Sequence, residues 1–247
     1  MRLIGLIGGM SAESTAHYYA HLNALARERL GGVHSARILL WSFDFAELEE
    51  MQRAGNWEEI ARRLGEAART LESAGADFFL ICANTMHKIA AKVQAQTRLP
   101  LLHIVDVTAA AIRAASPRKV GLLGTAYTME DPFFRDRLAH FGIEAIVPGE
   151  ADRKRCHEII FQELVKGIVR EESRAAYAGV IERLKSAGAE AIILGCTELS
   201  MVVDTAAAPL PCFDTAALHA KAAIDAALDE ATFARLSAGT NRKAHHA

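Results

Sequence analysis

The sequence lacks the motifs that mark metal enzymes and nucleotide-binding sites. Its four cysteines form no C-x-x-C pair and its ten histidines form no H-E-x-x-H motif, so a metal site is not expected. The Gly8-Gly9 turn is without the third glycine of the dinucleotide fingerprint, and no P-loop lysine follows it. No motif in the chain therefore implies a cofactor.

The chain also lacks an apolar segment long enough to span a membrane, and it has no basic stripe or aromatic-basic patch. Its formal net charge is −2, with acidic and basic residues interspersed, and we expect neither a nucleic-acid nor a membrane partner. Met1-Arg2-Leu3 leads into a predicted strand rather than a secretory leader, and the cysteine spacing is not that of disulfide-dense secreted modules. We expect a reduced, cytoplasmic protein.

What the chain does have is a regular alternation of short apolar runs with helix-compatible segments, over 247 residues of which 51% are hydrophobic. Short apolar runs bounded by turn residues predict buried strands, and their alternation with helices predicts mainly parallel sheets with right-handed crossovers. The predicted strands cover residues 2–7, 36–43, 77–81, 101–105, 119–123, 143–147, 190–194 and 210–213. The fold class is therefore α/β.

An internal repeat runs through the chain. Residues 74–85 and residues 187–198 share one pattern, which is a helix end, a glycine, a buried strand and a small polar turn. Shorter pairs follow the same order: Gly5-Leu6-Ile7-Gly8 with Gly121-Leu122-Leu123-Gly124, and Leu99-Pro100 with Leu210-Pro211. Repeats in register indicate two similar halves of one architecture.

We infer two pseudosymmetric, Rossmann-like halves, residues 1–116 and 117–230, followed by a C-terminal tail, residues 231–247, that is polar and expected to fray from Ser237. Each half is predicted to be a mainly parallel sheet flanked by helices. Ligands of open α/β sheets bind outside the carboxyl ends of the strands. The active site is therefore expected in the cleft between the halves.

Cys196 stands in the second copy of the repeat, in the run Leu194-Gly195-Cys196-Thr197-Glu198-Leu199 between a predicted strand and a helix-compatible segment. Backbone N–H groups and the positive end of a helix dipole favour a thiolate there, so we expect a pKa below the value of about 8.5 of a free cysteine. Such a thiol can act as a base or a nucleophile. The alternative is a buried structural cysteine.

The first copy of the repeat has Ala83 where the second has Cys196, and Cys82 pairs with Gly195. Adjacent residues of a strand point to opposite faces. Cys82 can therefore replace a cysteine at position 83 only if the turn rotates its side chain inward, and both outcomes are open.

Four further residues beside the two predicted turns have side chains suited to a substrate with carboxylates and an amino group. Asn84 and Thr85 can bind a carboxylate, or they can cap a helix. His87 can orient a cysteine or a carboxylate, or it can be a core histidine. Glu198 can accept a hydrogen bond from a substrate amine, or it can simply favour the first turn of a helix.

Taken together, three motifs resemble the aspartate/glutamate racemase family: Gly8-Gly9-Met10-Ser11 with Ser14-Thr15, Asn84-Thr85-Met86-His87, and Gly195-Cys196-Thr197-Glu198. The resemblance covers essentially the whole chain. It implies a cofactor-independent amino-acid racemase of two α/β halves, in which a thiolate removes the Cα proton and a thiol on the opposite side returns one. A homodimer is also implied.

By this likeness Cys196 is the acid/base of the second half, and Cys82 is the candidate for the first half because Ala83 departs from the family pattern. The substrate, an amino acid as a free small molecule, would be bound by Met10, Gln52, Asn84, Thr85, Thr197 and Glu198.

Two other functions remain open beside the racemase. One is a single-cysteine decarboxylase or isomerase of the same superfamily, which includes enzymes that decarboxylate arylmalonates with a second-half cysteine alone. The other is a ligand-binding homologue that kept the cleft and lost catalysis.

Overall fold

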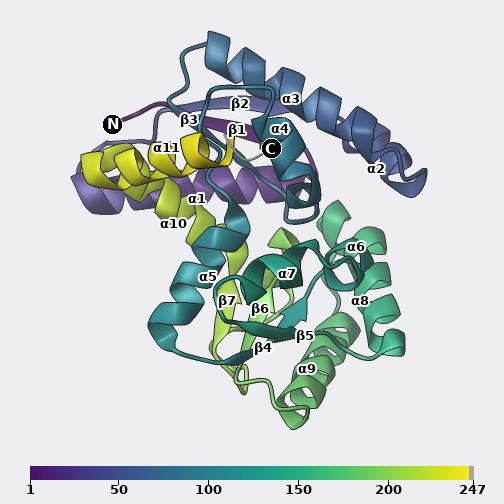
Figure 1. The fold of residues 1–247 in the computed structure, drawn as a ribbon. Coiled ribbons are helices and arrows are strands. Elements are labelled where there is room, and N and C mark those ends of the chain that lie inside the picture. Colours follow the sequence, from purple (N-terminus) through teal and green to yellow (C-terminus); the bar gives the residue numbers. More distant parts are fainter. Residues whose placement is uncertain (245–247) are drawn as a thin grey trace. The chain divides into compact units, whose positions relative to one another are not determined.

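The computed structural model describes residues 1–244 and divides the chain into two compact units. Unit 1 contains Met1–His103 together with the chain from His219 onward, and unit 2 contains Ile104–Leu218. Each unit has its own parallel sheet flanked by helices (Figure 1). The predicted α/β fold of two parallel sheets is confirmed.

The sheet of unit 1 has the strand order β2-β1-β3 and all of its pairs are parallel. Its strands are β1 (Ile4–Gly8), β2 (Ile38–Ser42) and β3 (Phe78–Ile81). Every residue of β1 and β3 is buried, whereas the edge strand β2 is partly exposed. Continuous apolar runs such as Phe78-Phe79-Leu80-Ile81 suit a parallel strand that is covered on both faces.

Helices cover both faces of this sheet, with α1 (Ala12–Leu30) on one side and α3 (Trp57–Ser73) on the other (Figure 1). The α3 face forms one core, in which Ile60, Leu64 and Leu71 pack against Ile7, Phe79 and Ile81. The remaining helices are α2 (Phe45–Arg53), η1 (Thr85–Ile89), α4 (Ala90–Gln94), α10 (Thr215–Leu228) and α11 (Glu230–Ala244).

The sheet of unit 2 has the order β5-β4-β6-β7, again wholly parallel. Its strands are β4 (Lys119–Leu123), β5 (Glu144–Ile146), β6 (Ala191–Leu194) and β7 (Cys212–Asp214). The interior strand β6 is fully buried, and alternate residues face two different cores.

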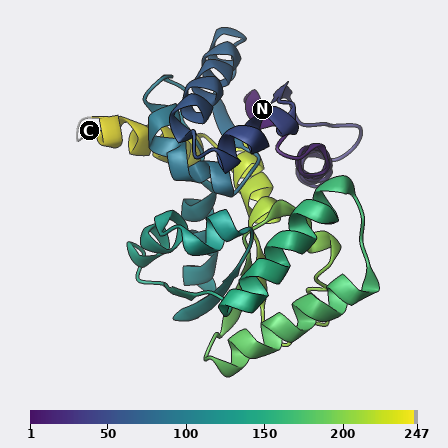
Figure 2. The ribbon, with the colours of Figure 1, turned by 90° about the vertical axis from the view of Figure 1, so that its right-hand side faces the viewer.

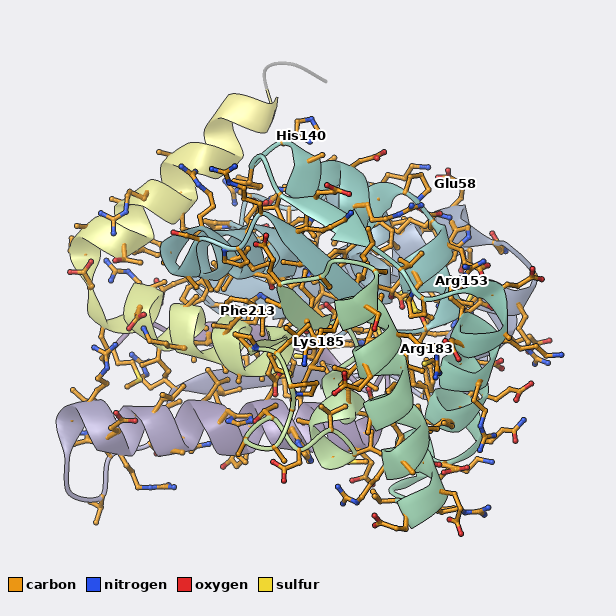
Figure 3. The ribbon with its side chains drawn as sticks, turned by 90° about the horizontal axis from the view of Figure 1, so that it is seen from below. Glu58, His140, Arg153, Arg183, Lys185 and Phe213 are labelled. Atoms are coloured by element: carbon orange, nitrogen blue, oxygen red, sulfur yellow. The ribbon has the colours of Figure 1, made fainter. Side chains whose placement is uncertain are left out.

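The helices of unit 2 are α5 (Ile104–Ala115), α6 (Ala126–Glu130), α7 (Phe133–Ala139), α8 (Glu150–Gln162), η2 (Leu164–Lys166), α9 (Glu171–Ser186) and η3 (Thr197–Met201). Figure 2 shows α8 and α9 as two neighbouring green helices. Arg183 of α9, labelled in Figure 3, donates to Asp152 of α8 through Nε at 2.7 Å and so links the two on their exposed side.

Most predicted strands are observed within one or two residues of their expected limits, but three elements differ from the prediction. Residues 101–105 were expected to form a strand, but only Leu101 makes a bridge, to Phe79, and α5 begins at Ile104. The stretch Phe45–Arg53, for which the sequence predicted a polar segment and no regular element, is the helix α2, capped by Asp44.

The third difference is the C-terminal tail. Its expected fraying from Ser237 is wrong as far as Ala244, because α11 is helical to that residue. Asp229 caps this helix by accepting from the backbone N–H of Thr232 at 2.6 Å, and Phe233 packs against Phe78. Residues 245–247 of the predicted tail lie outside the described residues.

The limits of the compact units differ from the predicted boundary between residues 116 and 117, which stays a prediction about the repeat. The alanine-rich helix α5 ends the first repeat but belongs to unit 2, where Arg137 binds Asp106 through Nη at 2.6 Å. The corresponding helix of the second repeat, α10, begins in unit 2 but belongs to unit 1 from His219 onward, where His219 bonds Tyr18 and the Ala227 carbonyl accepts from Arg2. Each unit therefore contains a helix encoded by the other half.

Candidate functional site

The Gly8-Gly9-Met10-Ser11 turn follows β1 and is fixed by the first turn of α1. The backbone N–H of Gly9 donates to Oγ1 of Thr15 at 2.8 Å, and the same hydroxyl donates to the carbonyl of Ser11 at 3.0 Å. Gly9 has φ +82°, and a Cβ there would lie 2.2 Å from the carbonyl oxygen of Phe43. Only glycine allows the chain to pass so close to its neighbour.

The end of β3 places Ala83 and Cys82 on different faces of the sheet. Ala83 belongs to the core on the α3 side together with Phe79 and Ile81, as the alternation along a strand requires. Cys82 has no exposed surface and is absent from that core as the described residues define it. Its backbone N–H continues the sheet by donating to Ile7 at 2.9 Å.

The same alternation in unit 2 places Cys196 where the repeat predicts it. Ile192, Leu194 and Cys196 share one core, on the side of α8 and α9, and Ile193 faces the other. The face of Cys196 in unit 2 is thus the counterpart of the face of Ala83 in unit 1. The internal repeat seen in the sequence therefore extends to side-chain direction.

Asn84 and Thr85 are buried polar residues at the point where β3 gives way to the 3-10 helix η1. His87, one turn further on, donates from Nδ1 to the carbonyl of Ala83 at 2.9 Å. The turn is therefore fixed by a hydrogen bond between an imidazole and the backbone, in addition to the backbone bond from His87 to Asn84 at 3.0 Å.

Met10 and Gln52, the other two predicted binding residues of unit 1, are both buried. Met10 packs in the core that contains Ala83. Gln52 lies in the last turn of α2, and its side-chain oxygen is buried without a hydrogen-bond partner among the described residues. A buried amide oxygen in this state costs free energy unless a ligand or water satisfies it.

Cys196, Thr197 and Glu198 form a hydrogen-bonded cluster directly beyond β6. The Cys196 thiol donates to Oε2 of Glu198 at 2.9 Å, and the Thr197 hydroxyl donates to the same oxygen at 2.8 Å. All three side chains are buried, with Cys196 only 8% exposed. Gly195 permits the turn, because a Cβ there would lie 2.7 Å from the carbonyl oxygen of Leu123.

The electrostatics of Cys196 are opposite to the expectation from the sequence. Burial raises the pKa of the thiol well above its usual value. The Glu198 carboxylate raises it further by charge repulsion and by accepting a hydrogen bond from the neutral thiol. The expected lowering is wrong because burial and the negative charge of Glu198 outweigh the backbone N–H groups of Thr197 and Glu198, which favour the thiolate. Burial also raises the pKa of Cys82.

The structure thus groups the predicted residues within their own units. Unit 1 contains Met10, Gln52, Cys82, Asn84 and Thr85, of which Cys82 faces away from the core that Ala83 joins. Unit 2 contains Cys196, Thr197 and Glu198, which are in direct contact.

Three buried residues around His87 were not predicted from the sequence. His103, from the segment before α5, and His219, from α10, contact the His87 ring, and Tyr18 of α1 is hydrogen-bonded to His219. No spacing rule relates residues so far apart in the chain. The sequence signal that could have indicated this cluster was an isolated histidine on an apolar helix, such as His219 in its alanine-rich stretch.

No group of three or more histidine, cysteine or carboxylate side chains suited to a metal ion occurs in the part of the chain that the structure describes. Within residues 1–244, none of the helices combines the length and the hydrophobicity that a bilayer span requires.

The structure is thus that of an α/β protein with two parallel sheets and a buried cysteine–carboxylate pair beyond an interior strand. The chain belongs to the Asp/Glu/Hydantoin racemase family, whose model matches residues 7–223.

The sequences and structures of individual relatives are consistent with this family assignment. A crystal structure from Yersinia pestis, described as that of a candidate Asp/Glu racemase, is 49% identical, with a TM-score of 0.86 over 93% of this chain and 100% of that chain. An aspartate racemase homologue from Pyrococcus horikoshii is 33% identical, with a TM-score of 0.82 over 93% and 100% of the two chains. The broad specificity amino-acid racemase RacX of Bacillus subtilis is 24% identical over 90% of this chain and 96% of its own length.

Proposed function

We propose that the protein is a cofactor-independent amino-acid racemase of the aspartate/glutamate type, with Cys196 as its acid/base. The observation that supports this most directly is the buried contact between the Cys196 thiol and Glu198, 2.9 Å apart, directly beyond β6. A thiol so placed already has a proton acceptor within hydrogen-bond distance, which is the geometry that acid–base catalysis requires.

Glu198 gives Cys196 two properties that suit removal of a weakly acidic Cα proton. The carboxylate raises the pKa of the thiol, so the thiolate, once formed, is a strong base. A substrate ammonium group that binds Glu198 would neutralise this charge and lower the cost of forming the thiolate. Substrate binding would thereby activate the base.

Carboxylate binding is assigned to the first-half residues, with Asn84 and Thr85 as donors from the turn after β3 and Gln52 as a further buried amide. Charge develops on the α-carboxylate when the Cα proton leaves. Preorganised donors around that group stabilise the transition state more than the ground state.

The proton for the opposite face is the point at which this chain departs from a two-cysteine scheme. Ala83 has no proton to give, and the Cys82 side chain leaves the strand on the other side. We propose that Cys196 takes the Cα proton and that a proton from solvent completes the inversion. The racemisation of a free amino acid then needs one thiol.

The test is deuterium incorporation at Cα in D₂O, starting separately from the L and D enantiomers of aspartate and glutamate. We expect exchange with inversion in the wild type, its loss in Cys196→Ser, and its retention in Cys82→Ala and in the control Cys212→Ala. Ala83→Cys, which restores a thiol on the matched face, should increase the rate. Absence of exchange from every enantiomer, or exchange that survives Cys196→Ser, would contradict the proposal. Loss in Cys82→Ala would assign the second proton to Cys82.

A second function, decarboxylation of a substituted malonate, is favoured by the same observation that only one of the two matched positions holds a cysteine. Decarboxylation creates the carbanion by loss of CO₂, so a single thiol is enough to deliver the proton. Release of CO₂ from 2-substituted malonates, together with no Cα exchange from amino acids, would identify this activity.

A further inference from the structure

We propose that His87 is a positioning residue, which fixes the direction of the Asn84 backbone N–H, and that Tyr18, His103 and His219 hold His87 in place. This inference rests on the proposed function, in which the turn at Asn84 binds the substrate carboxylate. It assigns a role to a buried histidine cluster that no part of that function uses.

The contact between His87 and Ala83 determines the orientation of one peptide group. The carbonyl of Ala83 can only accept, so Nδ1 of His87 must be the protonated nitrogen at 2.9 Å. The peptide that joins Ala83 to Asn84 is planar, and its N–H points opposite to its carbonyl. Because the imidazole holds the carbonyl, the Asn84 N–H is directed away from His87.

His87 is itself held by two other imidazoles. Its ring centroid lies 4.6 Å from that of His103 and 5.9 Å from that of His219, both in edge-on contacts. All three residues are buried, and His219 has no exposed surface. A ring enclosed by two others has little freedom to rotate out of its hydrogen bond to Ala83.

His219 is fixed at both of its ring nitrogens. Nε2 donates to the carbonyl of Leu102 at 2.8 Å, so Nδ1 of the neutral ring accepts from the hydroxyl of Tyr18, also at 2.8 Å. Burial, together with repulsion from His87, lowers the pKa of His219 to about 3, which keeps the ring neutral and this tautomer fixed. Tyr18 thus connects helix α1 to the turn through two histidines.

Packing alone does not account for this arrangement. Leucine or phenylalanine side chains would fill the same interior without the desolvation of several ring nitrogens and a hydroxyl, which costs free energy unless each is satisfied. The bond from His87 to Ala83 also stands two residues from Thr85, within the turn that the proposed function requires. The histidine cluster can orient that turn through hydrogen bonds, and an apolar core cannot.

The experiment compares His87→Leu, which removes the donor, with His87→Gln, whose amide can donate to Ala83 again. We expect the KM for the amino acid to rise roughly tenfold in His87→Leu, the equivalent of one hydrogen bond, with a smaller change in kcat. The Gln variant should recover most of that loss. Thermal unfolding of both variants shows whether they are folded.

His140→Leu is the matched control. His140 also bonds the carbonyl four residues before it, that of Asp136 at 2.7 Å, but it does so at the exposed end of α7 (Figure 3). We expect its removal to leave KM unchanged. A folded His87→Leu enzyme with the wild-type KM, or an equal effect of His140→Leu, would overturn the inference.

A second readout does not depend on turnover. Long-range ¹H–¹⁵N spectra of the histidines should show the Nδ1–H tautomer for His87 and the Nε2–H tautomer for His219 in the resting protein. His219→Leu should alter the His87 signals, whereas His140→Leu should not. If the wild type exchanges no Cα proton, the proposed function fails while these spectra still test the positioning geometry. An Nε2–H tautomer for His87 would refute that geometry even in an active enzyme.

Discussion

At the scale of the residue, Cys196 shows how far a motif predicts chemistry. The Gly-Cys-Thr-Glu run predicted that the thiol lies directly beyond a buried strand, because the apolar run before it defines that strand. It did not predict the pKa, since that depends on burial and on the side chain of Glu198 folding back over the sulfur. The strand pattern can be predicted from the sequence, whereas the rotamer of the Glu198 side chain depends on packing in the folded interior.

Glu198→Gln should make Cys196 more reactive toward alkylation while lowering the proposed activity. Removing the negative charge removes a cause of the raised thiol pKa, so the thiolate fraction at a given pH increases. We expect iodoacetamide to modify Cys196 about threefold to tenfold faster at pH 8.5, on the scale by which a neighbouring charge alters thiolate populations. Peptide mass spectrometry measures this rate.

Cys212 serves as the internal control in the same reaction, because its thiol contacts the carbonyl of Leu210 at 3.5 Å and has no carboxylate partner among the described residues. Its rate should be equal in the two proteins. Slower or unchanged alkylation of Cys196 in the variant would show that Glu198 does not suppress its thiolate.

At the scale of the element, local rules predicted most strands and helices and failed where tertiary contacts decide. The short segment after Pro100 has strand-forming residues, yet it makes a single bridge because α5 begins at Ile104. The C-terminal segment is polar, yet Asp229 caps it and Phe233 anchors it as α11. In the second case the partner of Phe233, Phe78, lies far away in the sequence.

The turn after β1 requires glycine at position 9. Gly9→Ala should lower the free energy of unfolding by roughly 2–4 kcal/mol, since a side chain at positive φ is strained and its Cβ would meet the Phe43 backbone. Gly55→Ala is the control: Gly55 also has positive φ, +69°, but no atom lies within 4 Å of the added carbon. Its cost should stay near 1 kcal/mol. Urea unfolding measures both, and equal losses would show that the close approach to Phe43 has no energetic weight.

At the scale of the whole molecule, the repeat and the compact units describe different things. The repeat is a pattern in the sequence, and its strands, turns and face assignments are found in the structure. Its halves are not the units that pack, because α5 and most of α10 belong to the unit of the other half. A sequence shows which segments are similar, but the exchange of two similar helices leaves the pattern unchanged and so cannot be predicted from it.

From the exchange of α5 and α10 between the two halves we predict how fragments of the chain fold. Residues 1–116 contain all of β1, β2 and β3 but lack α10 and α11, and so lose the Tyr18–His219 bond and the bond from Arg2 N–H to the Ala227 carbonyl. They also lose the packing of Phe233 on Phe78. We expect this fragment to show no cooperative urea transition by circular dichroism, because α1 alone then covers one face of its sheet.

The comparison chain joins residues 1–103 to residues 219–247 through a short Gly/Ser linker, which restores unit 1 as the structure defines it. The first segment of this joined chain is shorter than the fragment 1–116. We nevertheless expect the joined chain to unfold cooperatively, because α10 and α11 again cover the α1 side of the sheet. His219→Leu in this chain should lower the urea midpoint by removing the contact with Tyr18. Cooperative unfolding of residues 1–116, with the joined chain no more stable, would mean that the first repeat folds by itself and that α10 only covers a structure already formed.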